Sequence, residues 1–170
     1  MFKYFGLTLI IIVCGYTGHM MAASLSGRIK ELELAIALVG KLQTHIKYRR
    51  TPTIELIEEM AGYELFAPLC FIRDCGESLK VSSNFTAVWK NSLDSNRGRL
   101  RITNEDISLL MSMGDYLGNS DAEGQIKALQ FTETALGHNL KDAREQNAAK
   151  GKMYRSLGVL AGMGIAVFLI

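Results

Sequence analysis

Residues 25–46 read LSGRIKELELAIALVGKLQTHI, which is the clearest helical pattern in the chain. Apolar residues return every three or four positions, so they share one face of an α-helix. The members of this face are Leu25, Ile29, Leu32, Ile36, Val39, Leu42 and Ile46. The stretch therefore predicts an amphipathic helix whose apolar face must be buried against other helices.

The chain before this helix is apolar and uncharged. No residue from 4 to 27 carries a charge at neutral pH when His19 is neutral. Twenty helical residues span about 30 Å, the thickness of a bilayer core, and Lys3 and Tyr4 suit the membrane interface. No helix breaker follows, so we expect one continuous helix whose first part, residues 1–24, is transmembrane.

Two other interpretations of this end stay open. A cleaved signal peptide would use Lys3, the apolar run and the small residues Ala22 and Ala23 before the cleavage site. A lipoprotein signal would use Cys14, although Val13 stands where a small residue is expected. Continuity with the amphipathic helix favours an uncleaved anchor.

The other end of the chain is also apolar. Residues 156–170 read SLGVLAGMGIAVFLI and would span about 22 Å as a helix, less than a bilayer core. The pair Gly158 and Gly162 suits close packing between membrane helices, and local thinning of the bilayer could absorb the mismatch. We expect a second transmembrane helix over residues 155–170; the alternative is a buried C-terminal core helix.

Cations around the two apolar ends predict the orientation. Those on the inner flanks are Arg28, Lys30, Lys150, Lys152 and Arg155. Only Lys3 and the amino terminus lie on the outer flanks. Under the positive-inside rule, both ends place the central domain, residues 25–154, in the cytoplasm.

The middle of the chain predicts shorter helices separated by turns. Thr51 and Pro52 suit a helix start, as a cap followed by proline at the first helical position, and Gly62 suits the end of that helix. The next expected segments are a helix at 66–73 ending near Gly76, a helix at 84–93 with Trp89, and a turn at 94–98.

The last two helices carry capping signals. Thr103 with Asp106 resembles a capping box, and Ser120 with Glu123 matches one. Gly118 predicts a helix stop between them. No later proline interrupts the chain, so the last helix could run into the terminal apolar stretch. Its apolar register is Ile126, Leu129, Leu136, Leu140 and Ala143, weakened by Glu133 and Asn147.

We therefore predict an all-α fold, a helical bundle between an N-terminal and a C-terminal transmembrane helix. An apolar content of 48% and only two prolines agree with this fold. The net charge of +2 favours neither nucleic acid nor a polyanionic substrate. Three cysteines without a CxxC pair predict free thiols, mostly buried, in a reducing compartment.

No sequence pattern predicts catalysis. His19, His45 and His138 stand alone, outside any HExxH or ExxH pair, so no metal and no cofactor is expected. The paired acids Glu58 and Glu59 suit a solvated helix face. We expect a protein that is not an enzyme and that binds a protein partner through a helical surface.

Residues 46–50, IKYRR, hold the densest charge away from the predicted membrane ends. Cations at the end of a helix complement its dipole, which is a sufficient structural reason for them. A cytoplasmic partner must also meet exposed residues. Lys47, Tyr48, Arg49 and Arg50 are therefore the candidate partner-binding residues, and nucleic acid is not the expected partner.

Three short motifs follow one another along the chain. They are Tyr48 with Thr51 and Pro52, then Leu117, Gly118, Asp121 and Gln125, then Tyr154, Arg155, Leu157 and Gly158. In order and spacing they resemble the stage III sporulation protein AB family of endospore-forming bacteria. Residues 62–101 show the least resemblance. The motif positions either stabilise the fold of the domain or contact a partner.

The resemblance implies a role in sporulation, in the complex that links mother cell and forespore. Family members are similar to the inner-membrane platform subunit of type II secretion systems. The implied protein is a platform or adaptor in the mother-cell membrane facing the forespore. Its implied partners are a cytoplasmic secretion-type ATPase of the same operon and other membrane subunits of the channel, and the resemblance is compatible with an oligomer.

Two other functions fit the residues alone. A membrane-anchored helical sensor would relay a signal by helix movement and would hold a ligand pocket in its bundle. A secreted helical protein would follow from the cleaved signal peptide.

Overall fold

The computed structural model describes the backbone of residues 2–49 and 51–168. Side chains are described for residues 16, 20, 23–49, 51–150 and 153. Throughout these residues the secondary structure is helical and contains no strand, which confirms the predicted all-α fold.

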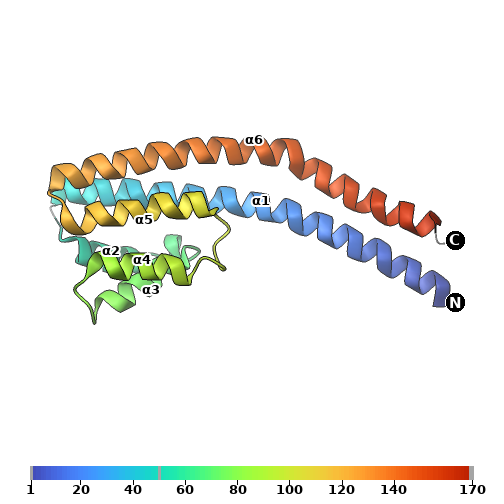
Figure 1. Cartoon of the computed structure of the whole chain (residues 1–170), viewed down its shortest axis with the longest axis horizontal. Coiled ribbons are helices and arrows are strands. Elements are labelled where there is room, and N and C mark those ends of the chain that lie inside the picture. The colour runs from blue at the N-terminus through green and yellow to red at the C-terminus, as the bar shows by residue number, and fades with distance from the viewer. Residues whose placement is uncertain (1, 50, 169–170) are drawn as a thin grey trace. The chain divides into compact units, whose positions relative to one another are not determined.

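The helices follow one another with short connections (Figure 1). In chain order they are α1 (Phe2–Arg49), α2 (Thr53–Ala61), the 3-10 helix η1 (Glu64–Phe66), α3 (Cys70–Leu79), α4 (Phe85–Ser95), α5 (Asn104–Asn119) and α6 (Ala122–Phe168). α1 and α6 are continuous, as the lack of helix breakers predicted. The chain divides into two compact units, one of residues 30–140 and one of residues 1–29 with 141–170.

The predicted transmembrane segments fall mostly outside the described side chains. Over the part of the chain that the structure does describe, we find no helix with the length and apolar character needed to cross a membrane. Residues 1–24 and 155–170 therefore stay predicted membrane segments, and the boundaries of the central domain stay a prediction as well.

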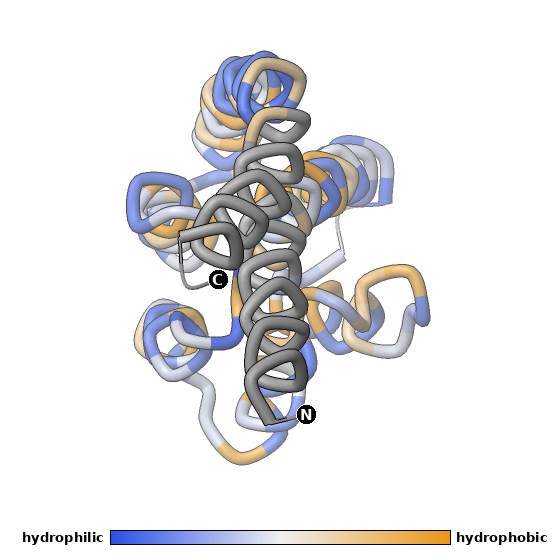
Figure 2. Tube along the Cα trace, turned by 90° about the vertical axis from the view of Figure 1, so that its right-hand side faces the viewer, coloured by the Kyte–Doolittle hydropathy of each residue, from blue (hydrophilic) through white to orange (hydrophobic). Residues whose placement is uncertain are grey.

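The unit of residues 30–140 is built from two groups of helices. α1, α5 and α6 run side by side, and α2, α3 and α4 pack on one side of α1 and α5 (Figure 1). Hydrophobic and hydrophilic residues are interspersed along these helices, as expected of amphipathic helices (Figure 2). The predicted apolar face of α1 is buried within this unit at Leu32, Val39, Leu42 and Ile46.

Trp89 lies at the centre of the contact between α4 and α5. It is fully buried, and its indole N–H donates to the Leu110 carbonyl at 2.7 Å. Phe71 meets the indole edge-on with centroids 5.4 Å apart, and Phe85 stacks on it at 5.8 Å. A Cβ at Gly114 would lie 2.3 Å from the indole Cδ1. α4 can approach α5 this closely because residue 114 has no side chain.

α3 differs from the prediction of a helix over 66–73 that ends near Gly76. It spans Cys70–Leu79, while Phe66 belongs to η1. Gly76 is buried inside α3, and a Cβ there would lie 2.7 Å from the Ala61 Cβ. This glycine therefore permits close packing of α2 on α3 and does not end a helix.

The turn predicted at 94–98 is shifted. α4 continues to Ser95, and the turn covers residues 96–99. Asn96 is buried, and its Nδ2 donates to Asp74 Oδ2 at 2.7 Å and to the Ser92 carbonyl at 2.9 Å. Its polar side chain thus joins the end of α4 to α3.

A buried carboxylate fixes the loop before α5 to α1. Only 8% of Glu31 is exposed, and its Oε2 accepts from the backbone N–H groups of Arg101 at 2.6 Å and Ile102 at 3.2 Å. Burial raises the pKa of this carboxyl, and the two N–H groups act in the opposite direction. Burial therefore favours the protonated form, and the two hydrogen bonds offset part of that effect.

A second buried carboxylate caps α5. Asp106 Oδ2 accepts from the Thr103 N–H at 2.9 Å, and the Asp106 N–H donates to Thr103 Oγ1 at 3.3 Å, which confirms the predicted capping box. The other oxygen, Oδ1, accepts from Asn139 Nδ2 at 2.7 Å. One side chain therefore starts α5 and attaches it to α6.

Two of the three cysteines are described, and both are free, as predicted. Cys75 is buried, and Cys70 is partly exposed. Cys14 lies outside the described side chains.

Gly114→Ala should destabilise the protein by about 1–3 kcal/mol, because its methyl group would overlap the Trp89 indole. Thermal and chemical unfolding of the full chain in detergent, followed by the fluorescence of its only tryptophan, measures this. Gly137→Ala is the matched control, since its Cβ meets nothing within 4 Å. We expect the control to be neutral or slightly stabilising. Equal stability of both variants would contradict the close packing at Trp89.

Glu31→Gln should change how stability depends on pH. The pKa of Glu31 is raised in the folded state, so its protonated form is favoured there and stability falls as pH rises above its ordinary value of 4.5. The variant cannot ionise and escapes this loss. Unfolding of both proteins across pH 4 to 8 should show the variant gaining stability relative to the native chain as pH rises. At pH values below the ordinary pKa of the carboxyl, the difference in unfolding free energy between the two proteins should be constant. A difference that does not change with pH would contradict the shift.

Candidate functional site

The last turn of α1 carries the candidate partner-binding residues. Lys47, Tyr48 and Arg49 are exposed, with 74% of the Tyr48 surface accessible. The Lys47 ammonium lies 5.3 Å from the centroid of the Tyr48 ring, within the range of a cation–π contact. Arg50 lies outside the described residues. We call Lys47, Tyr48 and Arg49 the α1 end. The helix dipole explains the two cations, but it does not explain why the Tyr48 ring is exposed.

The neighbouring face of α1 is used for internal packing. Lys41 Nζ lies 4.0 Å over the Tyr63 ring, and His45 Nδ1 lies 3.6 Å from Glu59 Oε2. The Tyr63 hydroxyl donates to Glu59 Oε1 at 2.7 Å, and this bond raises the pKa of Tyr63. These contacts attach α1 to α2 and to the segment before η1.

A hollow of about 390 Å³ opens beside the α1 end, between α1 and α6. Besides Lys47 and Tyr48, it is lined by Gly40, Gln43 and Thr44 of α1 and by Ile126, Gln130 and Glu133 of α6. We call it the α1–α6 hollow. Sequence analysis missed it because its walls come from segments some 90 positions apart, joined by the hydrogen bond from Gln43 Nε2 to Glu133 Oε2 at 2.6 Å.

The polar residues in the register of α6 pair with α1. Glu133 accepts from Gln43, and Asn147 Oδ1 accepts from Ser26 Oγ at 3.5 Å. The sequence predicted these two residues as interruptions of an apolar face. In each compact unit, one of these two residues instead forms a polar contact between the long helices. The signal available in the sequence was the polar residue on α1 that each one meets, Gln43 for Glu133 and Ser26 for Asn147.

The first motif lies at the start of α2. Thr51 was expected to cap this helix, but α2 begins at Thr53 and Pro52 takes the N-cap position, without a side-chain cap. The Pro52 carbonyl accepts from the Leu56 N–H at 3.0 Å. Gly62 follows the last residue of the helix, as predicted.

In the second motif, Gly118 has a packing role. The prediction that it stops the helix is wrong, because α5 continues to Asn119. A Cβ at residue 118 would lie 2.4 Å from Thr86 Oγ1 and 3.3 Å from Phe85 Cδ1. The glycine thus allows the end of α5 to meet the start of α4.

Asp121 of the same motif caps α6. Its Oδ1 accepts from the Gly124 N–H at 3.0 Å, and α6 begins at the residue after it. The predicted capping box with Ser120 as the cap is therefore one residue early. Glu123, expected in that box, pairs with Lys127 at 2.7 Å.

The second motif meets the first residue of α2 at one carbonyl. The Leu117 carbonyl accepts from Thr53 Oγ1 at 3.2 Å and from Gln125 Nε2 at 3.2 Å. Gln125 also donates to the Ser120 carbonyl at 3.0 Å. Leu117 itself is buried, and a hollow of about 360 Å³ lies at this junction, lined in part by Pro52, Leu117 and Gln125. These motif positions therefore have roles in folding.

The third motif belongs to α6. Tyr154, Arg155, Leu157 and Gly158 lie within this helix, but their side chains are outside the described residues.

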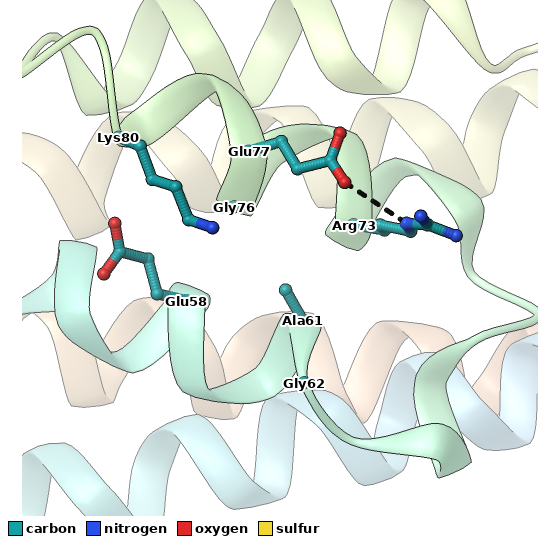
Figure 3. Close-up of a pocket in the computed structure, with 7 residues that line it drawn as sticks. All are labelled: Glu58, Ala61, Gly62, Arg73, Gly76, Glu77 and Lys80. Atoms are coloured by element: carbon teal, nitrogen blue, oxygen red, sulfur yellow. Dashed lines mark hydrogen bonds and ion pairs between the residues drawn. The ribbon is translucent and has the colours of Figure 1, made fainter.

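A smaller hollow of about 210 Å³ lies between α2 and α3 (Figure 3). Glu58 projects toward it from α2 and Lys80 from the turn after α3, while Arg73 and Glu77 of α3 pair at 3.3 Å. That pair is well exposed and adds little stability. Charges of both signs line the hollow, so it favours no partner of one charge.

The described residues offer little for chemistry. Nowhere among them do three or more histidine, cysteine, aspartate or glutamate residues come together to hold a metal ion. Burial raises the pKa of Cys75 to about 12, so its thiol is a poor nucleophile at neutral pH. The surface that the structure does provide, the α1 end and its hollow, suits contact with another macromolecule.

Comparison with known proteins agrees with the motifs. The sequence model of stage III sporulation protein AB (spore_III_AB) matches residues 3–170. The chain is similar to stage III sporulation protein AB of Bacillus subtilis (strain 168), with 27% identity over 172 residues and full coverage of both chains. No solved structure matches. Because the match extends over nearly the whole chain, this protein belongs to the stage III sporulation protein AB family.

Proposed function

We propose that the protein is a non-enzymatic, membrane-anchored adaptor in a secretion-like complex of sporulation. Its membership in a family of sporulation proteins gives the biological process. The observation that carries the adaptor role is the α1 end, where Lys47, Tyr48 and Arg49 are exposed and the first two line a hollow. The proposed partner is a cytoplasmic secretion-type ATPase of the same operon, with other membrane subunits of the channel.

Both ends of the chain are proposed as membrane anchors. The support is the uncharged sequence of residues 4–27 and 156–170, of which residues 4–27 lie in α1 and residues 156–168 in α6. Cations concentrate on the inner flanks, which favours a cytoplasmic central domain of residues 25–154. The proposed location is the mother-cell membrane that faces the forespore.

The α1 end has the composition of an interface centre. Tyrosine and arginine are enriched among the residues that dominate binding energy, and cations raise the rate of association with an acidic surface. Lys47 lies about 25 Å along α1 from Lys30, the cation that flanks the predicted membrane segment. That distance leaves room for a cytoplasmic partner.

Reversing two charges at the α1 end should weaken ATPase binding. Lys47→Glu with Arg49→Glu replaces two exposed cations by anions and should reduce affinity at least about tenfold, more strongly at low salt. Binding of the purified ATPase to the full chain in detergent, measured at several salt concentrations, gives the result. The chain should stay helical and the unfolding temperature should fall only slightly, because both side chains are exposed and lose only their favourable interaction with the helix dipole.

Arg73→Glu with Lys80→Glu is the matched control. It makes the same change in net charge at exposed residues in α3 and just after it, and it should leave affinity within about twofold. Equal weakening by both double variants would mean that only net charge matters. An unaltered chain that does not bind the ATPase would contradict the adaptor role itself.

A cysteine at Val81 should report the orientation of the chain. Val81 is 93% exposed in the turn after α3, whereas Asn96 is buried and unsuitable for labelling. In a chain without its native cysteines, Val81→Cys should resist a membrane-impermeant maleimide in intact cells and react after lysis. Labelling of intact cells above the level of the cysteine-free parent would contradict a cytoplasmic central domain.

A further inference from the structure

The connection between α4 and α5, residues 96–103, reads NRGRLRIT and contains three arginines and no acid. We call it the α4–α5 loop. Its side chains alternate between the inside and the outside of the fold: Leu100 and Ile102 are buried, whereas Arg99 and Arg101 are exposed. The two apolar side chains attach the loop to the core, and the two arginines are left at the surface.

The α4–α5 loop lies beside α1 (Figure 1). Glu31, the second residue of the unit of residues 30–140, accepts from the backbone N–H groups of Arg101 at 2.6 Å and Ile102 at 3.2 Å. The predicted membrane segment ends at Ser24, and the seven positions from there to Glu31 rise about 10 Å along α1. The loop is therefore attached to the end of the unit that continues into the predicted membrane segment.

Folding uses the backbone of this loop more than its exposed guanidinium groups. Glu31 binds the N–H groups of the loop, not the Arg101 side chain. Arg99 Nη1 donates to Asn96 Oδ1 at 3.1 Å. Neither Arg99 nor Arg101 forms an ion pair with a carboxylate among the described side chains. The fold thus gives no full account of these two cations.

The charges beside these arginines leave the surface of the loop positive. The third arginine, Arg97, is paired with Asp94 at 2.6 Å. The exposed acid Glu105 lies in the first turn of α5, where the helix dipole favours a negative charge. Arg99 and Arg101 therefore outnumber the exposed acids of the loop and of the helix ends that it joins.

α1 adds no excess of exposed charge at this level. Lys30 and Glu33 are both exposed and are opposite in sign. Glu31 is buried, and burial raises its pKa, whereas the two N–H groups and the nearby Arg101 charge lower it. The exposed charge of α1 here is balanced, so the positive charge of this surface comes from the loop.

We propose that the α4–α5 loop binds anionic lipid headgroups of the membrane that holds the chain, through the guanidinium groups of Arg99 and Arg101. The guanidinium group of arginine can donate two hydrogen bonds to one phosphate. Anionic lipids attract cations only within about 10 Å of the surface at ordinary salt, and the attachment to Glu31 holds the loop next to the predicted membrane segment. This inference rests on the proposed membrane anchors and gives the folded unit a second contact with the bilayer.

A fluorophore on the loop measures this contact. Gly98 is exposed and a Cβ there meets nothing within 4 Å, so Gly98→Cys in a chain without native cysteines provides the label site. Val81→Cys is the control site, 93% exposed on the connection at the other end of α4. Both full chains are reconstituted into vesicles of phosphatidylcholine alone, or of equal parts phosphatidylcholine and phosphatidylglycerol. Acrylamide, a neutral quencher in the water phase, reports the exposure of each label.

Phosphatidylglycerol should protect the label at residue 98. We expect its acrylamide quenching to fall at least about twofold, and the label at residue 81 to show no change. High salt should reverse the protection, because it screens the attraction between the arginines and the lipids.

Variants of the two arginines separate charge from folding. Arg99→Gln with Arg101→Gln should abolish the protection, whereas Arg99→Lys with Arg101→Lys keeps the charge and should retain part of it. Lys47→Gln with Arg49→Gln is the matched control, since it removes the same net charge at the α1 end. Equal loss of protection in this control would show an effect of net charge alone and would overturn the loop contact.

Flotation with the phosphatidylcholine vesicles tests the anchors separately. A chain that floats with both kinds of vesicle but shows equal quenching at residue 98 in each would overturn the loop contact and leave the anchors intact. A chain that floats with neither would overturn the anchors and this inference together.

Discussion

The hydrogen bond from the Trp89 indole to the Leu110 carbonyl, 2.7 Å long and fully buried, is the contact on which the folded unit depends. A buried indole N–H must find an acceptor, and only a helix as close as α5 can supply one here. Gly114 makes this approach sterically possible. On α5, which is held against α4, the capping-box residue Asp106 accepts a hydrogen bond from Asn139 of α6 at 2.7 Å. This bond, together with the Gln43–Glu133 bond, holds α6 and with it one wall of the α1–α6 hollow.

Buried and half-buried polar groups set the register of the long helices. Apolar faces alone permit several sliding positions, because one leucine packs almost as well as the next. A polar pair such as Gln43 with Glu133 tolerates only one, since a shift would leave both groups without partners in a partly buried place. Glu31 acts in the same way on the loop before α5, at a cost visible in its raised pKa. Such pairs add specificity more than stability.

The motifs that identify the family and the surface proposed for a partner are largely different residues. Gly118, Asp121 and Gln125 each have a local structural task, in packing, in capping α6 and in holding the Leu117 carbonyl. Among the residues whose side chains are described, Lys47 and Tyr48 have no comparable partner on another helix. A motif can therefore establish the fold of a family member without marking where it binds. The partner surface has to be sought among exposed residues that folding does not explain.

The sequence alone determined the helical fold, the two continuous long helices, the buried face of α1 and the capping box at Thr103 and Asp106. These features depend on hydrogen bonds and periodicity within a few residues, so local sequence specifies them. Tertiary structure decided that Gly76 and Gly118 are packing glycines and that Asn96 is buried, because Ala61, Thr86 and Asp74 stand beside them. Tertiary structure also decided that Gly40 lines a hollow, because the opposite wall of that hollow is formed by residues of α6. Each of these outcomes depends on a neighbour that is distant in sequence. The local sequence around a residue carries no information about which distant residue the fold places beside it.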